Sequence, residues 1–163
     1  MEDKGGVLES LKTMLENKEL VDVSSLKVGD IIYVSLDEDD GLILKDGYKS
    51  RMKYIVIIGF TPEGHAVGSL LINSNINPLL WSEEMMNCQY PLRRTTYPYI
   101  LDYDSWLDCS DIFEISKLKM SMNKARLKGR LCDEDCQRVM DCLRISDVID
   151  NATKRRYGII KDI

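Results

Sequence analysis

The sequence has no long hydrophobic run and only one histidine, four prolines and five cysteines in 163 residues. Its longest uninterrupted apolar run, residues 54–58, is far shorter than the roughly 20 residues that a transmembrane helix needs. The N-terminus opens with Glu2, Asp3 and Lys4 and shows no basic stretch followed by an apolar one, which argues against a secretory signal. We therefore expect a cytoplasmic protein that does not contact a membrane.

An odd number of cysteines argues against the paired disulfide framework of a small secreted protein, so we expect free thiols. Cys132 and Cys136 have C-x3-C spacing, but no second pair accompanies them and His65 is distant in the sequence. Structural zinc usually takes four thiolate or imidazole ligands. The sequence therefore predicts no metal site and no cofactor, and we interpret the cysteines as small, buried side chains.

The overall composition is that of a soluble globular chain, with 44% hydrophobic and 30% charged residues. A chain of this length can form one domain with a substantial core. Acidic residues outnumber basic ones by 27 to 22, which gives a net charge of −5. Because an acidic surface repels a polyphosphate at long range, any binding of nucleic acid requires a local basic groove.

The clearest structural signal is the run at residues 51–60, in which a basic pair leads into β-branched and aromatic side chains. Such a run is typical of a strand that is buried on both faces. A turn at residues 61–64 returns the chain into a second strand at 65–73, so we expect an antiparallel hairpin. His65 lies at the turn and is predicted to be an exposed polar residue rather than a general base.

Polar side chains gather at the other end of this predicted hairpin. Arg51 and Lys53 open the first strand, and antiparallel pairing brings Asn73 and Ser74, at the end of the second, to the same rim of the sheet. Cationic head groups leave the apolar interior and lie at such a rim, where ligands bind. The alternative is that the two cations only keep the strand end hydrated.

Helical spacing precedes the predicted sheet. Residues 7–18 place five apolar side chains on one face, namely Val7, Leu8, Leu11, Met14 and Leu15. We expect this helix to pack against the side of the domain, since a stripe of this kind belongs to a core more often than to a partner interface. A turn at residues 24–30 and a first strand at 31–36 follow.

The segment at residues 74–98 is predicted to be irregular. Arg93 and Arg94 lie between Tyr90 and Tyr97, and interleaved aromatic and basic residues can stack bases and hold phosphates. The same pattern fits an insertion that its aromatic side chains anchor to the body of the protein.

Further short strands are predicted at residues 99–101 and 112–115, with residues 117–120 continuing the second. A helix with an acidic first turn is predicted at about 133–143. Another short helix follows Ser146 and ends before Gly158, and its basic trio, Lys154, Arg155 and Arg156, is an alternative phosphate contact.

Taken in order, five segments within about residues 28–143 resemble the MazF/PemK family of toxin endoribonucleases. They are a G-D-[IV] strand opening at Gly29, an arginine-led aliphatic strand at Arg51, a strand ending near Ser74, a D-S-x-[VL] segment at Asp104, and a G-x-L at Gly129 before an acidic helix start. The resemblance implies a mainly β (α+β) fold, a small SH3-like barrel carrying an N-terminal helix and C-terminal helices.

On this basis residues 1–163 form a single domain. Residues 1–23 are its N-terminal helical extension, 24–143 its barrel core with one helix, and 144–163 its C-terminal helical tail. The resemblance also implies a homodimer that acts on single-stranded RNA and an antitoxin protein as a partner.

The activity implied by the resemblance is cleavage of single-stranded RNA without a metal, through attack of a ribose 2′-hydroxyl on the neighbouring phosphorus. Arg51 and Ser74 are then the catalytic candidates, and Lys53, Asn73, Arg93 and Arg94 are candidates for substrate binding. Either Tyr48 or Tyr90 is a candidate for stacking a base.

Two positions depart from the family pattern. Met52 follows Arg51 where the family has proline, which leaves Arg51 and Lys53 as alternatives for the catalytic cation. Asn73 and Ser74 stand where the family has its catalytic threonine or serine, so Ser74 supplies the nearest hydroxyl. The rival hypothesis is a catalytically inactive SH3-like barrel that binds a peptide or RNA.

Overall fold

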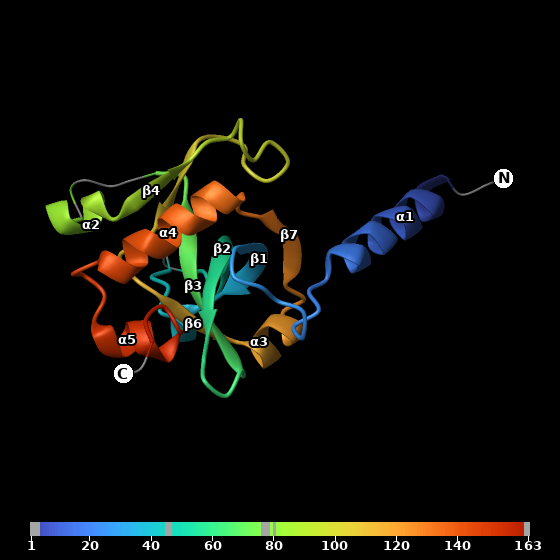
Figure 1. Ribbon diagram of the computed structural model, residues 1–163. Coiled ribbons are helices and arrows are strands. Elements are labelled where there is room, and N and C mark those ends of the chain that lie inside the picture. The colour runs from blue at the N-terminus through green and yellow to red at the C-terminus, as the bar shows by residue number, and fades with distance from the viewer. Residues whose placement is uncertain (1–3, 45–46, 76–78, 80, 162–163) are drawn as a thin grey trace.

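The computed structural model describes residues 4–44, 47–75, 79 and 81–161. Its centre is a curled, antiparallel sheet in the order β4-β5-β3-β2-β1-β7, and β6 also pairs with β3 (Figure 1). The strands are β1 (Asp30–Leu36), β2 (Arg51–Phe60), β3 (Ala66–Asn73), β4 (Gln89–Leu92), β5 (Ser105–Asp108), β6 (Phe113–Ser116) and β7 (Arg126–Arg130). The mainly β, barrel-like class predicted from the sequence agrees with this architecture.

Helices flank the sheet. They are α1 (Lys4–Glu19), α2 (Glu83–Asn87), α3 (Lys117–Met122), α4 (Asp133–Ile145) and α5 (Asn151–Arg156), and a 3-10 turn, η1, covers Glu38–Asp40. Both predicted C-terminal helices are therefore present. The acidic first turn of α4 suits the positive N-terminal end of that helix.

Strand β2 is buried on both faces, as predicted, because its side chains alternate between two apolar clusters. Val56 and Ile58 belong to the cluster that includes residues of α4. Ile55 and Ile57 belong to a second cluster that includes a residue of α3. All four side chains are at most 1% exposed, so β2 forms the centre of the core.

The hairpin of β2 and β3 has one end closed by its turn and one open end. At the closed end the turn is fixed by a hydrogen bond from the Gly64 nitrogen to the Thr61 oxygen, at 2.9 Å. Gly59 and Gly68 lie against Tyr157, which follows α5, and a Cβ atom at Gly59 would lie only 2.1 Å from the Tyr157 carbonyl oxygen. The C-terminal tail thus packs directly onto the hairpin, and Tyr157 occupies the space beside the two glycines at the closed end.

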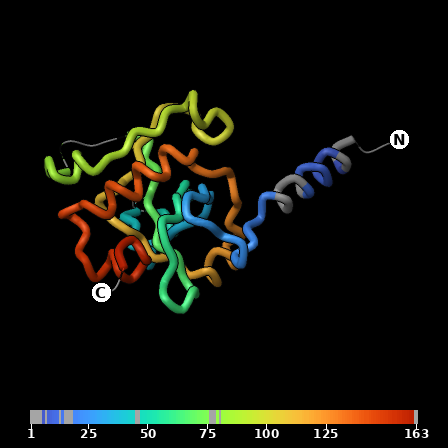
Figure 2. Tube along the Cα trace, viewed as in Figure 1, coloured from blue at the N-terminus to red at the C-terminus, as the bar shows by residue number. Residues whose placement is uncertain are grey.

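Helix α1 extends away from the body of the protein (Figure 2). The prediction that it packs against the side of the domain is wrong. Leu8, Leu11 and Met14 are 68%, 52% and 58% exposed, because the helix projects away from the sheet (Figure 1). The helix joins the body at its C-terminal end, where Lys128 of β7 pairs with Glu19 at 3.0 Å. Among the helices of the described residues, none is long and apolar enough to span a membrane.

Three local predictions between β4 and α4 are also wrong. Residues 99–101 form turns, since the nitrogens of Ile100 and Leu101 both donate to the Tyr97 carbonyl oxygen. The sheet strand lies instead at β5, where no strand was predicted, and it pairs with β3 and β4. Residues 117–120 do not continue β6 but start α3, which Ser116 caps by accepting a hydrogen bond from the Lys119 nitrogen.

Candidate functional site

A cleft of about 220 Å³ lies at the open end of the hairpin, between the rim of the sheet and the loop that leads into β5. Arg51, Lys53 and Ser74 all border it, so three of the residues predicted from the sequence come together at one place. Arg51 and Ser74 are exposed and Lys53 is half-buried. Solvent and a ligand can therefore reach the polar groups of the cleft.

These residues reach the rim from opposite faces of the sheet. Side chains alternate along a strand, so Arg51 and Lys53 share the face of Ile55, whereas Tyr54 and Ser74 belong to the other face. Both sets border the cleft because the strands end there. An extended ligand that crosses this rim can contact cations on one side and an aromatic surface on the other.

The two cations have no acidic partner in the part of the chain that the structure describes: no ion pair there involves Arg51 or Lys53. The Lys53 ammonium instead donates a hydrogen bond of 3.1 Å to the Asn73 side-chain oxygen. Burial, and then the positive charge of Arg51, lower the pKa of Lys53. Two neighbouring cations of this kind favour the binding of an anion.

Aromatic side chains form the opposite part of the cleft. The rings of Tyr33 and Tyr54 are direct neighbours across β1 and β2, with centroids 4.5 Å apart and planes inclined by 32°. Tyr103 lies in the facing loop and is 61% exposed. Burial raises the pKa of Tyr54, with smaller contributions from Tyr33 and Asp102, so the Tyr54 hydroxyl stays protonated at neutral pH.

The loop between β4 and β5 forms one wall of the cleft, and this wall is anchored to α4. The hydroxyls of Tyr90 and Tyr97 donate hydrogen bonds to the two carboxylate oxygens of Asp135, the former at 2.6 Å. The Tyr97 hydroxyl also accepts a hydrogen bond from the Cys132 nitrogen. Burial and the bond to Asp135 raise the pKa of Tyr90 to about 12 and raise that of Tyr97 as well. The wall is therefore anchored by the charged Asp135 carboxylate, which accepts hydrogen bonds from the two neutral tyrosine hydroxyls.

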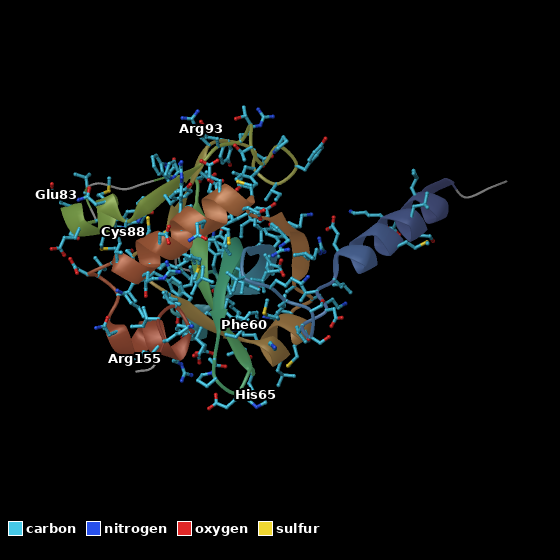
Figure 3. All side chains as sticks on the ribbon, in the orientation of Figure 1. Phe60, His65, Glu83, Cys88, Arg93 and Arg155 are labelled. Atoms are coloured by element: carbon cyan, nitrogen blue, oxygen red, sulfur yellow. The ribbon has the colours of Figure 1, made fainter. Side chains whose placement is uncertain are left out.

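Arg93 and Arg94 do not border the cleft. Both are exposed on the loop after β4, and Figure 3 shows Arg93 at the edge of the molecule, far from His65 at the hairpin turn. The Arg94 nitrogen donates to the Asp104 carboxylate at 2.9 Å, which ties the start of this loop to its end. His65 is exposed, as predicted. Of the two stacking candidates, Tyr90 donates a hydrogen bond to Asp135, and Tyr48 lines a different cavity, which Arg51 also borders.

The basic trio after Ser146 does not form a phosphate contact as a unit. Lys154 is only 4% exposed, and its ammonium donates to the carbonyl oxygens of Arg144 and Ser146, at 3.0 and 2.6 Å, at the C-terminal end of α4. Arg156 pairs with Glu114 at 2.7 Å. The prediction is wrong for Lys154, because capping a helix end requires the cation to turn inward.

The sequence analysis missed Tyr33, Tyr54, Asp102 and Tyr103 as cleft residues. Tyr33 and Tyr54 looked like ordinary strand residues, and only the register of β1 and β2 sets them side by side at the rim. Because a strand was predicted at residues 99–101, Asp102 and Tyr103 were not expected to lie in a loop that borders the cleft. Residues 105–108 do not alternate between polar and apolar side chains, so the strand-favouring Trp106 beside Leu107 was the available signal for a strand after the loop.

All five cysteines are free, as expected, but only Cys109 is buried, whereas Cys132 and Cys142 are exposed. Within the described ranges, no group of three or more histidine, cysteine or acidic side chains is arranged to hold a metal ion. No protein-family model and no curated protein matches the chain in sequence. The geometry of the cleft therefore carries the functional argument.

Proposed function

We propose that the cleft at the open end of the hairpin binds single-stranded RNA and cleaves it without a metal, as in the MazF/PemK family, on an SH3-like barrel. The observation that carries the proposal is the cation pair of Arg51 and Lys53, which has no acidic partner among the described residues and lies beside an aromatic surface and the Ser74 hydroxyl. The cations can attract the phosphates of RNA, and the aromatic rings can stack against its unpaired bases.

Single-stranded RNA fits this arrangement better than a duplex. The aromatic surface and the cations lie on opposite sides of one rim, so a base and its phosphate must separate to reach both. A flexible single strand can turn its base toward Tyr33 and Tyr54 while its phosphate lies at Arg51. The net charge of −5 leaves little general attraction for RNA, which confines binding to this local site.

The proposed reaction is an internal transfer at phosphorus. The ribose 2′-oxygen forms a bond to phosphorus as it loses its proton, the bond from phosphorus to the 5′-oxygen breaks, and the leaving oxygen gains a proton. The products are a 2′,3′-cyclic phosphate and a 5′-hydroxyl. Negative charge grows on the phosphoryl oxygens, and the planar guanidinium of Arg51 can donate two parallel hydrogen bonds to them.

Lys53 and Ser74 have supporting roles in this proposal. Lys53 lies on the same strand face as Arg51, two residues away, and places a second positive charge beside the phosphate. Ser74 borders the cleft from the end of β3 and offers a hydroxyl that can position a phosphoryl oxygen. Asn73 holds the Lys53 ammonium in place through their 3.1 Å hydrogen bond.

The test is the cleavage rate of an unstructured RNA of mixed sequence by the wild-type protein and two arginine variants. Arg51→Ala should lower the rate about 100-fold or more, since a preorganised donor to the transition state is removed. Arg144→Ala is the matched control because Arg144 is an exposed residue of α4 whose ion pair with Asp141 lies on that helix. Equal loss in both variants, or an intact RNA with the wild-type protein, would contradict the proposal.

Binding without cleavage is the outcome that favours the rival hypothesis of an inactive RNA-binding barrel. In that case Arg51→Ala weakens retention of the RNA and no cleavage products form. The family resemblance also leads us to propose a homodimer and an antitoxin partner, and light scattering of the purified protein tests the former.

A further inference from the structure

The cleft at the hairpin's open end holds one acidic side chain that the proposed reaction does not use. Asp102 borders the cleft opposite Arg51 and Lys53, in the loop that leads into β5. It is exposed, and within the described residues no cation forms an ion pair with it. A carboxylate weakens the attraction of a site for phosphate, so its presence in this cleft calls for another role.

The position of Asp102 is fixed by the residues on both sides. Leu101 is only 5% exposed and packs into the core, and Asp104 accepts the hydrogen bond from the Arg94 nitrogen. The loop is further held through Tyr97, whose hydroxyl donates to Asp135. The backbone at Asp102 is thus supported on both sides, so that mainly the side-chain rotamer of Asp102 has to be ordered when it binds a ligand.

The aromatic surface beside Asp102 suits a single planar ring. Tyr54 is close enough for the negative charge of Asp102 to contribute to its raised pKa, and Tyr54 packs beside the ring of Tyr33. Tyr103 follows Asp102 directly in the chain and also borders the cleft. All four residues line one cleft, so a base that lies against these rings can turn its edge toward the Asp102 carboxylate.

Among the four bases of RNA, guanine is the one whose Watson–Crick edge offers two adjacent donors, N1–H and the N2 amino group. An ionised carboxylate has two acceptor oxygens and no donor, so it can accept both hydrogen bonds in parallel. Adenine and cytosine each place an acceptor next to their amino group. Uracil has one N–H between two carbonyl oxygens, and these acceptors repel a carboxylate.

We propose that Asp102 makes this cleft selective for guanine, by accepting hydrogen bonds from N1–H and N2–H while the base lies against Tyr33, Tyr54 and Tyr103. The inference rests on the proposed binding of single-stranded RNA and names the nucleotide that the site prefers. It does not depend on cleavage, because recognition of the base and stabilisation of the reacting phosphate use different residues.

The test is the affinity of the full-length protein for the 3′-monophosphates of guanosine, inosine and adenosine, measured by isothermal titration calorimetry. Inosine keeps N1–H but lacks the N2 amino group, so its affinity should be about tenfold lower than that of guanosine. Adenosine should bind more weakly than inosine. Asp102→Asn should abolish the preference, whereas Asp133→Asn, an exposed residue of α4 outside the cleft, should preserve it.

The outcomes separate this inference from the proposed reaction. Because all three nucleotides carry the same phosphate, Arg51→Ala should weaken their binding by a similar factor. Equal affinities in the wild-type protein, or a guanosine preference that survives in Asp102→Asn, overturn the role of Asp102. Absence of binding by all three overturns it together with the RNA site. A guanosine preference in a protein that leaves RNA intact supports the inference and contradicts cleavage.

Discussion

The open and closed ends of the hairpin formed by β2 and β3 belong to the same two strands but have opposite properties. At the closed end, Gly59 and Gly68 leave just enough room for Tyr157, and all three residues are buried and tightly packed. At the open end, Arg51 and Lys53 border a cleft of about 220 Å³. The strands are thus anchored at one end, which allows the other to hold charged groups without a local apolar core.

This difference shows how the hairpin can support an electrostatically unfavourable site. Two cations near each other, one of them half-buried, destabilise the folded state in the absence of an anion. The four central side chains of β2, each at most 1% exposed, supply compensating apolar burial. We therefore expect substitutions at the closed end to change stability and substitutions at the open end to change binding.

The largest effect is expected for Gly59→Ala. The new methyl group would lie 2.1 Å from the Tyr157 carbonyl oxygen, so the backbone of one segment must move. The free energy of unfolding should fall by about 3 kcal/mol, as for a severe case of overpacking, measured by urea denaturation. Ser74→Ala, at the open end, is the control and should change stability by less than about 0.5 kcal/mol. A similar stability for both variants would mean that the closed end is not the anchor.

The next largest effect is expected for Lys53→Met, which should weaken RNA binding and slightly raise the stability of the protein. Removing the ammonium should weaken RNA binding about tenfold, since a charge-assisted contact is lost. The variant should nevertheless be slightly more stable at neutral pH, by less than about 1 kcal/mol, because the residue is only half-buried and its charge is screened. Fluorescence anisotropy with a labelled RNA and urea denaturation measure the two effects.

The pH dependence of the Lys53→Met effect follows from the lowered pKa of Lys53. The unfolded chain holds this proton more tightly than the folded protein, so the wild-type protein gains stability relative to the variant as pH rises through the lowered pKa. The advantage of the variant should be full at neutral pH and should vanish above the ordinary lysine pKa of 10.5. An advantage that grows with pH would contradict the assigned cause.

The smallest effect on RNA binding is expected for Asp135→Asn, which weakens the anchor of the cleft wall without changing a residue of the cleft. Burial alone would raise the pKa of Asp135, but the hydrogen bonds from Tyr90, Tyr97 and Cys132 and the charge of Arg138 together outweigh it, and the pKa is lowered. Loss of the charge should cost about 1 kcal/mol of stability and weaken RNA binding only about threefold, an order-of-magnitude expectation for a residue that acts through the wall.

The sign of the pH dependence provides a check on this anchor. A carboxylate with a lowered pKa in the folded protein stabilises it above the unfolded value, and this contribution disappears as pH falls through the lowered value. The difference between the wild-type protein and Asp135→Asn should therefore be full above about pH 5 and shrink below the ordinary value of 3.8. Asp141→Asn, which changes an exposed carboxylate of the same helix, is the matched control and should lower the stability at neutral pH less than Asp135→Asn does.

Much of the sheet could be predicted from the sequence because its strands carry local signals. The strands at residues 31–36, 51–60 and 65–73 combine β-branched runs with turn residues between them, and all three are present. Those signals also placed Arg51, Lys53 and Ser74 at one rim, since antiparallel pairing follows from the hairpin alone. The helix predicted at 133–143 was equally clear from its acidic start and its periodicity.

The remaining features depend on contacts between distant segments. The apolar face of α1 resembles that of a packed helix, and its own sequence does not show that these side chains are exposed in the folded protein. Lys154 looked like a solvent-exposed cation, but the end of α4 supplies two carbonyl oxygens that hold it inside. The cleft required the loop after β4 to fold back against β1 and β2, which no local pattern indicates.

The most direct test of the proposed reaction is cleavage of two matched oligonucleotides in the presence of EDTA. One is all RNA, and the other carries a single 2′-deoxy nucleotide on the 5′ side of the bond that is cut. We expect cleavage of the first, with a 2′,3′-cyclic phosphate in the product, and binding without cleavage of the second. Equal cleavage of both, or loss of all cleavage in EDTA, would contradict attack by the 2′-hydroxyl at a metal-independent site.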